Sequence, residues 1–542
     1  MYKIIYACFL LILFSCQNKE LIHEPIKADS IQKHLSELSH DKYLGRMPCA
    51  DGEPLTIDYL VNELKSLGLK GIDGDNYLQD VPLLTIDGKM SEKMTIDFDE
   101  EKMVLEKGKD FVIHSQRKTE KLSLNQSELV FCGYGIVDEK LGWNDYADLD
   151  MKGKTAVVLV NDPGYGSEDP NFFKGDIMTY FGRWTYKYEE ADRQGADGLI
   201  IIHETSSAGY PWFVVQSSWT GPQQGLSGID RSNDCGIKGW ITLQKAKALF
   251  ETAGLNFTDE IKSARKKGFK PKKLNAKVSV GLENKYSECI SKNVLAYLPG
   301  SKYENEYVIY TAHWDHIGIG NAVDGDSIYN GALDNASGTA AVLSIAEAYA
   351  TSSSKPERSV VFLFVTAEEQ GLLGSEFYTA NPVFPLDKTV CNLNMDGVNP
   401  AGLMKDFTIT GIGHSDMDKY AEEAAIAQGR YVIAEKEPEK GSFFRSDHFN
   451  FAKAGVPALY ADGGYDHAEK GTEYAQSFKD DFIARKYHAP SDEYIEEEWN
   501  LEGMVQDAQI YYNIGSRIAN NRDWPKWTPE SEFKRPRNDL NN

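Results

Sequence analysis

The sequence predicts an α/β fold in which a mostly parallel (mixed) sheet is flanked by helices, and three observations support this prediction. From about residue 293 onward, short β-branched or apolar runs alternate with helical patterns. Several of these runs end in Asp, Glu or His, at the strand ends where ligands gather in open α/β sheets. Of the 542 residues, 41% are hydrophobic and 11% aromatic, which is enough to bury large cores.

The elements of this sheet follow from hydrophobic periodicity. Strands are expected at 307–312, 359–366, 390–395 and 456–461. Helices are expected at 336–350, 416–428 and 501–518. Two earlier helices lie within 29–70, where apolar residues keep helical spacing and Gly68 ends the second helix.

A second, β-rich region interrupts this pattern. Short strands at 129–132, 155–160 and 199–202 and a helix at 186–194 give it a βαβ-like order. We therefore divide the chain into a signal segment (1–16), a tether (17–28), the first part of a main domain (29–121), an insert (122–284), the rest of the main domain (285–522) and a polar C-terminal tail (523–542).

The charge balance excludes one class of partner. The chain has 58 Lys and Arg against 82 Asp and Glu, a formal net charge of −24. Because a chain with this net negative charge repels phosphate backbones, we expect no nucleic-acid partner. No run of about 18 apolar residues occurs, so no membrane-spanning helix is expected.

The N-terminus carries an export signal. A short basic start is followed by an apolar run over 4–14, too short to span a bilayer but typical of a signal peptide. Leu13-Phe14-Ser15-Cys16 resembles a bacterial lipobox, which implies lipidation of Cys16. We expect an exported lipoprotein that touches the membrane only through its lipid anchor and faces the periplasm or the cell surface. The alternative is an ordinary cleaved signal with a chance Cys.

The remaining cysteines suggest no disulfide framework. Five stay after Cys8 and Cys16 are set aside, and no CxxC pair is present. We interpret them as small buried apolar residues. They are Cys49, Cys132, Cys235, Cys289 and Cys391.

Residues able to bind metal follow the predicted strands in order. They are His313, Asp315, Asp334, Glu368, Glu369, Asp396 and, later in the chain, His488. Imidazoles with carboxylates suit zinc rather than soft thiophilic ions. Two divalent ions about 3.5–4 Å apart need one bridging carboxylate, and a further carboxylate must stay free as a base. No HExxH helix, GxSxG elbow or P-loop is present.

This ordered set resembles the co-catalytic zinc exopeptidases of the twenty-eighth metallopeptidase family. The matching segments are His313-x-Asp315, Leu333-Asp334-Asn335, Glu368-Glu369, Met395-Asp396, Ser446-Asp447-His448 and Tyr487-His488. The family includes bacterial leucyl-type aminopeptidases and glutamate carboxypeptidase II. The middle segment is similar to the family's inserted protease-associated domain, particularly at Gly133-Tyr134-Gly135 and Gln194-Gly195-Ala196.

The resemblance implies a cofactor of two Zn²⁺ ions. His313 and Asp396 would bind one ion, Glu369 and His488 the other, and Asp334 would bridge them. The family often has a strained peptide after the bridging Asp, here Asp334-Asn335.

The resemblance also implies catalytic roles. Glu368 would be the general base, and Asp315 would hydrogen-bond His313 to fix its tautomer. Arg445, Asp447 and His448 would lie at the substrate pocket. Phe443-Phe444-Arg445 departs from members that have Tyr in this segment, which leaves substrate preference open.

We therefore expect an aminopeptidase that releases N-terminal residues from peptides with a free N-terminus. A carboxypeptidase of the same family is the nearest alternative, but the sequence shows no Arg cluster for a substrate carboxylate. A glutaminyl-cyclase-like acyltransferase and a non-catalytic peptide-binding lipoprotein are further alternatives. The sequence leaves the oligomeric state and the role of the insert open.

Overall fold

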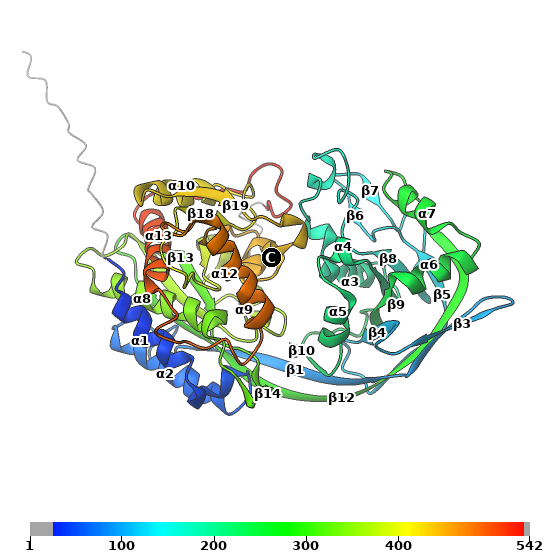
Figure 1. Cartoon of the computed structure of the whole chain (residues 1–542), viewed down its shortest axis with the longest axis horizontal. Helices are drawn as coiled ribbons and strands as arrows, with labels where there is room; N and C mark the ends of the chain where they lie inside the picture. The colour runs from blue at the N-terminus through cyan, green and yellow to red at the C-terminus, as the bar shows by residue number, and fades with distance from the viewer. Residues whose placement is uncertain (1–24, 536–542) are drawn as a thin grey trace, which may run out of the picture.

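The computed structural model describes residues 25–535 and contains two bodies joined by long strands (Figure 1). We call them the main domain and the insert. Among the described residues, no helix has both the length and the apolar character needed to cross a bilayer. The predicted signal segment and Cys16 lie outside the described residues.

Four parallel strands form the centre of the main domain. In spatial order they are β20 (Ala458–Gly463), β17 (Thr389–Asn394), β13 (Tyr303–His313) and β16 (Arg358–Val365). β12 (Lys272–Leu298) joins antiparallel to β16 at one side, and β18 (Asp406–Ile409) joins antiparallel to β20 at the other, followed by β19 (Tyr431–Ala434). The mostly parallel, mixed sheet is therefore confirmed.

Helices cover both faces because successive strand side chains point to opposite sides. In β16, Val360, Phe362 and Phe364 belong to one hydrophobic core, and Val361, Leu363 and Val365 to another. The first core is closed by α1 (Ala28–Leu38), α2 (Gly52–Ser66), α8 (Ser337–Thr351), α10 (Met417–Ala427) and α13 (Leu501–Ala519). The second is closed by α9 (Leu373–Ala380) and α11 (His448–Lys453). The predicted helices are confirmed.

The insert has its own parallel strands and its own core. Their order is β5 (Lys121–Phe131), β8 (Lys154–Leu159), β9 (Gly198–His203) and β11 (Ile237–Thr242), with β4 (Phe111–His114) antiparallel at the edge. Its helices include α3 (Trp184–Arg193), α5 (Trp212–Ser218), α6 (Leu243–Thr252) and α7 (Phe257–Ala264). This core already begins at Met90 and includes residues of β2 (Lys93–Asp97) and β3 (Lys102–Glu106). The sequence-based division began the insert at residue 122. It therefore placed residues 90–114 in the main domain, although they belong to the insert.

A two-stranded ribbon connects the two bodies (Figure 1). β12 is 27 residues long and pairs with β16 of the main domain near one end and with β5 of the insert near the other. β1 (Leu78–Met90) runs antiparallel along its middle, from Val294 to Leu282. The division at 284 and 285 thus falls inside a continuous strand.

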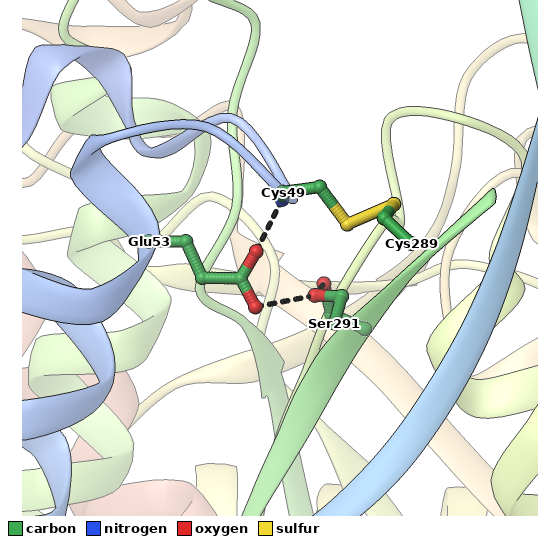
Figure 2. The surroundings of a disulfide bond; sticks show 5 residues. Cys49, Glu53, Cys289 and Ser291 are labelled. Atoms are coloured by element: carbon green, nitrogen blue, oxygen red, sulfur yellow. Dashed lines mark hydrogen bonds between the residues drawn. A yellow bond between two sulfur atoms is a disulfide. The ribbon is translucent and has the colours of Figure 1, made fainter. Parts of the chain in front are cut away.

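A disulfide between Cys49 and Cys289 ties the loop before α2 to this ribbon (Figure 2). The expectation of no disulfide was wrong, because the partners are 240 residues apart and only the fold brings them together. Beside the bond, buried Glu53 accepts hydrogen bonds from the Cys49 N–H and, at 2.9 Å, from the Ser291 hydroxyl. Cys132, Cys235 and Cys391 are buried, as predicted, and none of the three is in a disulfide.

The sequence analysis assigned residues 17–28 to a tether and residues 523–542 to a polar tail. In the described part of both segments, several side chains are buried. Ile26, assigned to the tether, is buried, and its N–H donates to Gln509. In the tail, Trp527 and Phe533 are buried in a cluster with Phe443, Phe449 and the insert residue Met178. We call this group the interface cluster, because it joins the insert to the main domain.

Candidate functional site

The metal-competent residues meet at one edge of the main-domain sheet. β13 ends at His313, and Glu368, Glu369 and Asp396 follow β16 and β17 within a few residues. Because these strands are parallel and adjacent, their carboxyl ends lie side by side. Asp334 lies in a helical turn (Ala332–Ala336) directly before α8.

Asp334 faces two separate groups of side chains. Its Oδ1 lies 3.3 Å from His313 Nε2, which is itself 3.2 Å from Asp396 Oδ1. Its Oδ2 lies 3.3 Å from His488 Nε2, which is 3.0 Å from Glu369 Oε2. The structure thus brings the five predicted ligands together in the predicted grouping, with Asp334 between the two groups.

Backbone contacts hold Asp334 in this position. The peptide bond between Asp334 and Asn335 is cis, at the place where the sequence predicts an unusual peptide. The carboxylate of buried Asp492 accepts hydrogen bonds from the N–H groups of Leu333 (2.9 Å) and Asp334 (3.1 Å). The Asn335 amide donates to the Met395 carbonyl at 3.0 Å, linking this turn to the strand end that carries Asp396.

Glu368 lies beside these groups. Its Oε2 is 3.9 Å from His313 Nε2, farther than the carboxylates that pair with this imidazole. Burial raises the pKa of Glu368 well above its ordinary value; His313 opposes this, while Asp396 and Glu369 add to it. A carboxyl group with a raised pKa can both accept and return a proton near neutral pH.

Asp315 does not make the predicted hydrogen bond to His313. His313 Nδ1 lies 3.1 Å from the main-chain oxygen of Asp315, whereas the carboxylate is 3.8 Å away. The carboxylate instead accepts from the N–H groups of Glu368 (3.1 Å) and Glu369 (3.3 Å). Asp315 therefore orients the loop that carries both glutamates, while its backbone orients the imidazole. Burial raises the pKa of Asp315 to about 7, against the effect of His313.

The sequence analysis missed His316 and gave no role to Ser446, which it named only as part of a matching segment. His316 is buried, with Nδ1 2.5 Å from Glu369 Oε1 and with Nε2 lacking a hydrogen-bond partner among the described residues. Its position directly after Asp315, at the same strand end, could have indicated it. Ser446 donates to Asp396 Oδ2 at 2.5 Å, and only the fold shows this contact.

The predicted pocket residues separate in the structure. Arg445 is exposed near the ring of Tyr210 in the insert. Asp447 is fully buried and accepts a hydrogen bond from Ser375 at 2.6 Å. His448 is also fully buried, between the rings of Phe443 and Tyr460. Asp447 and His448 therefore support the loop around Ser446 instead of lining an open pocket.

The electrostatics of the site favour a bound cation. Six carboxylates gather here, and none has a Lys or Arg nitrogen within 4 Å in the part of the chain that the structure describes; they are Asp315, Asp334, Glu368, Glu369, Asp396 and Asp447. Although burial opposes it, neighbouring carboxylates, Glu369 foremost, raise the pKa of His488 to about 10. Ligand atoms of His313, Asp334 and Asp396, and of His316, Asp334 and Glu369, lie within 4.8 Å of one another. These residues fit metal ions of the zinc type.

A family comparison agrees with this geometry. Residues 293–513 match the model described as Peptidase family M28, and this segment contains every candidate ligand. Residues 293–513 are therefore similar to peptidase family M28.

Two curated proteins resemble part of the chain in sequence. The chain is 34% identical over 137 residues to Aminopeptidase NAALADL1 of Mus musculus, covering 24% of this chain and 17% of that protein. It is 30% identical over 185 residues to Leupeptin-inactivating enzyme 1 of Streptomyces exfoliatus, covering 33% and 38%. These matches span well under half of either relative.

One solved structure resembles the chain over almost its whole length. The aminopeptidase from Aneurinibacillus sp. strain AM-1 aligns with a TM-score of 0.51 and 20% identity, covering 93% of this chain and 96% of that one. At this identity the likeness shows the fold alone, and its coverage extends over both the main domain and the insert.

Proposed function

We propose that this protein is an exported, zinc-dependent aminopeptidase that removes N-terminal residues from peptides with two metal ions. The observation that carries the proposal is Asp334, whose two oxygens face His313–Asp396 on one side and His488–Glu369 on the other. An arrangement with a shared carboxylate suits two divalent ions. The name of the mouse relative favours the aminopeptidase over the carboxypeptidase alternative.

The protein's residues then divide the chemical work. Zinc, when bound, lowers the pKa of water and polarises a carbonyl group. Glu368 accepts the proton of the attacking water and passes it to the departing amine, since its buried carboxyl has a raised pKa and lies outside both ligand groups. Asp315 holds the backbone of Glu368 and Glu369, and Ser446 holds Asp396.

A pair of peptides tests the proposed activity. One peptide carries a free N-terminus and its twin is N-acetylated; both are incubated with zinc-loaded protein, with Glu368→Ala as the blank. Stepwise loss of N-terminal residues from the free peptide alone is expected. C-terminal shortening of both peptides would support the carboxypeptidase alternative, and no cleavage of either would contradict a peptidase function.

Export is part of the same proposal. It rests on the signal-like segment 1–16 and the lipobox ending in Cys16. The disulfide between Cys49 and Cys289 supports it, because disulfides persist mainly in oxidising compartments outside the cytoplasm. Mass spectrometry of the mature N-terminus is expected to find an acylated Cys16. A chain that still begins at Met1 would contradict export, and an unmodified Cys16 would contradict lipidation.

A further inference from the structure

A buried arginine joins two of the segments that carry metal-competent residues. Arg46 lies between α1 and α2, and its side chain is only 1% exposed. Its Nε donates to the Trp314 carbonyl at 2.8 Å, and its Nη1 and Nη2 donate to the carbonyls of Asn330 (2.6 Å) and Gly331 (2.9 Å). Nη1 also donates to the Leu38 carbonyl of α1 at 2.7 Å. Each nitrogen of the guanidinium is therefore bonded to a main-chain oxygen.

These carbonyls belong to both sides of the candidate site. The first one directly follows His313 at the end of β13, and Gly331 directly precedes the turn that holds Asp334. The main chain of Arg46 makes a further contact, because its carbonyl accepts from the His316 N–H at 3.3 Å. One residue thus links the two backbone segments whose side chains meet at 3.3 Å, between His313 Nε2 and Asp334 Oδ1.

The loop that carries Arg46 has an unfavourable backbone conformation. Leu44, Gly45 and Arg46 have positive φ angles of 50°, 67° and 53°. Non-glycine residues keep such angles only where surrounding contacts enforce them, and such strain is concentrated at functional sites. A Cβ atom at Gly45 would come within 2.5 Å of the main-chain oxygens of Gly318 and Tyr329, so the loop packs directly against both neighbouring segments. We attribute the strain to the placement of the Arg46 side chain between them.

The far end of this loop is attached to the central strands. Cys49, three residues after Arg46, forms the disulfide with β12 shown in Figure 2. Glu53 accepts from the Cys49 N–H and from the Ser291 hydroxyl, which is 2.6 Å from the Thr366 hydroxyl. Thr366 directly follows β16, just before the two candidate glutamates. Contacts after Arg46 therefore fix the loop relative to β12 and β16.

The charge of Arg46 reaches the site without occupying a carboxylate. Burial lowers its pKa to about 10, and the negative charges of Asp492, Asp315 and Asp334 oppose this shift. In the described chain its hydrogen bonds go to carbonyl oxygens alone. The guanidinium therefore balances part of the negative charge while the carboxylate oxygens stay available to a metal ion.

We propose that Arg46 is a positioning residue for the metal centre, whose guanidinium holds the His313 and Asp334 segments at the spacing that two metal ions need. An arginine presents five N–H donors in a rigid plane, so it can join several carbonyls at once where a lysine cannot. This inference rests on the proposed function, and it gives Arg46 no part in proton transfer.

Zinc binding by the metal-free full chain tests the proposal. Arg46→Met removes every donor and should raise the Kd for zinc, measured by calorimetry, about 10–100-fold, as is common when a group that orients metal ligands is lost. Arg46→Lys keeps the charge and part of the hydrogen bonding, so its Kd should lie between the two. With cobalt(II) in place of zinc, the visible absorption bands should shift in Arg46→Met. At saturating zinc, kcat should fall with little change in KM.

Arg358 provides a matched control at the opposite end of the same sheet. It is also fully buried, pairs with Glu306 and donates through Nη1 to the carbonyls of Ile518 (2.7 Å) and Asp523 (2.9 Å) at the start of β16. Arg358→Met should therefore lose stability as Arg46→Met does, because each leaves enclosed carbonyls without a donor. Its zinc Kd and cobalt spectrum should stay those of the unmodified protein.

The outcomes separate positioning from general stability. An unchanged zinc Kd in Arg46→Met, or an equal loss of affinity in Arg358→Met, would overturn the proposal. If Arg46→Met does not fold, Arg46→Lys carries the same comparison, and failure of both to fold would also overturn it, because the residue would then serve the fold as a whole. If the zinc-loaded unmodified protein cleaves no peptide, the proposed function fails, while the zinc affinities still decide the role of Arg46. Peptide cleavage with an unchanged zinc Kd in both variants would reject Arg46 alone.

Discussion

The molecule contains two buried clusters of charge, and they are satisfied in different ways. In the insert, Asp145 accepts hydrogen bonds from the N–H groups of Tyr134 and Ile136 and from the Trp143 indole. Asp162 accepts from Gly164 and from both donors of Thr179. Buried Lys187, which donates to the Tyr134 carbonyl at 2.6 Å, supplies their positive charge.

At the metal centre the carboxylates face imidazoles and one another. In the described chain no Lys or Arg nitrogen lies within 4 Å of these carboxylates, although the charge of buried Arg46 acts on Asp315, Asp334 and Glu369. Hydrogen bonds from the protein reach Asp315, Asp396 and Asp447. The difference shows that buried charge by itself does not indicate a site. Buried charge indicates a functional site where the surrounding chain leaves that charge without a nearby opposite charge or hydrogen-bond donors.

The largest expected effect concerns the base. Glu368→Gln should lower kcat by about 10²–10⁴-fold, because only the proton acceptor is removed. Metal analysis of Glu368→Gln should find the same zinc content as in the unmodified protein. Glu473→Gln, an exposed substitution on α12 (Gly471–Arg485), serves as the control and should leave kcat unchanged. Unaltered turnover in Glu368→Gln would remove this residue from the mechanism.

The second prediction compares one carboxylate from each cluster. Zinc at about a hundred times its Kd should stabilise the unmodified protein by about 2.7 kcal/mol. This stabilisation should be lost in Asp334→Ala and retained in Asp162→Ala, since Asp162 is satisfied by its own loop. Thermal unfolding with and without zinc measures it. Equal zinc stabilisation in both variants would contradict the bridging role of Asp334.

The third prediction tests the self-sufficiency of the insert cluster. Lys187→Met removes the donor to the Tyr134 carbonyl and leaves that buried acceptor unsatisfied, which should cost about 1–3 kcal/mol of stability. The loss should be the same with and without zinc. Urea unfolding provides the measurement, with exposed Lys266→Met as the control. A loss that zinc reverses would show that the two clusters are coupled.

The smallest expected effect concerns His414, a buried imidazole away from the candidate metal centre. Burial lowers the pKa of His414, which stacks on Phe443, to about 4. In the unfolded chain His414 binds a proton near pH 6.5, whereas in the folded chain it does so only near pH 4. The free energy of unfolding therefore falls as the pH falls between these two values. At pH 5 the loss is about 2 kcal/mol.

His414→Gln checks the sign of this effect. Relative to the unmodified protein, the variant should be more stable at pH 5 than at pH 7, as measured by urea unfolding. His488 should behave oppositely in zinc-free protein, because its raised pKa adds stability below pH 6.5 that is lost as pH rises toward about 10. An equal difference between variant and unmodified protein at both pH values would contradict the assignment for His414.

The sequence by itself determined the elements and the ligand set of the main domain. Its strands and helices follow local hydrophobic periodicity, and a parallel sheet necessarily gathers the ends of its strands at one edge. The positions of His313, Glu368, Glu369 and Asp396 could therefore be predicted as a group. Asp334 and His488 were named with them as metal-competent residues, and the family resemblance supplied their specific roles.

The tertiary structure decided what depends on contacts between distant segments. Cys49 and Cys289 meet only because β12 passes the loop before α2, and the Met178 N–H reaches the Pro438 carbonyl only because the insert folds back onto the main domain. No local pattern records such pairings, since each partner has an ordinary neighbourhood in the sequence. Only the packing of the chain gives these residues their partners.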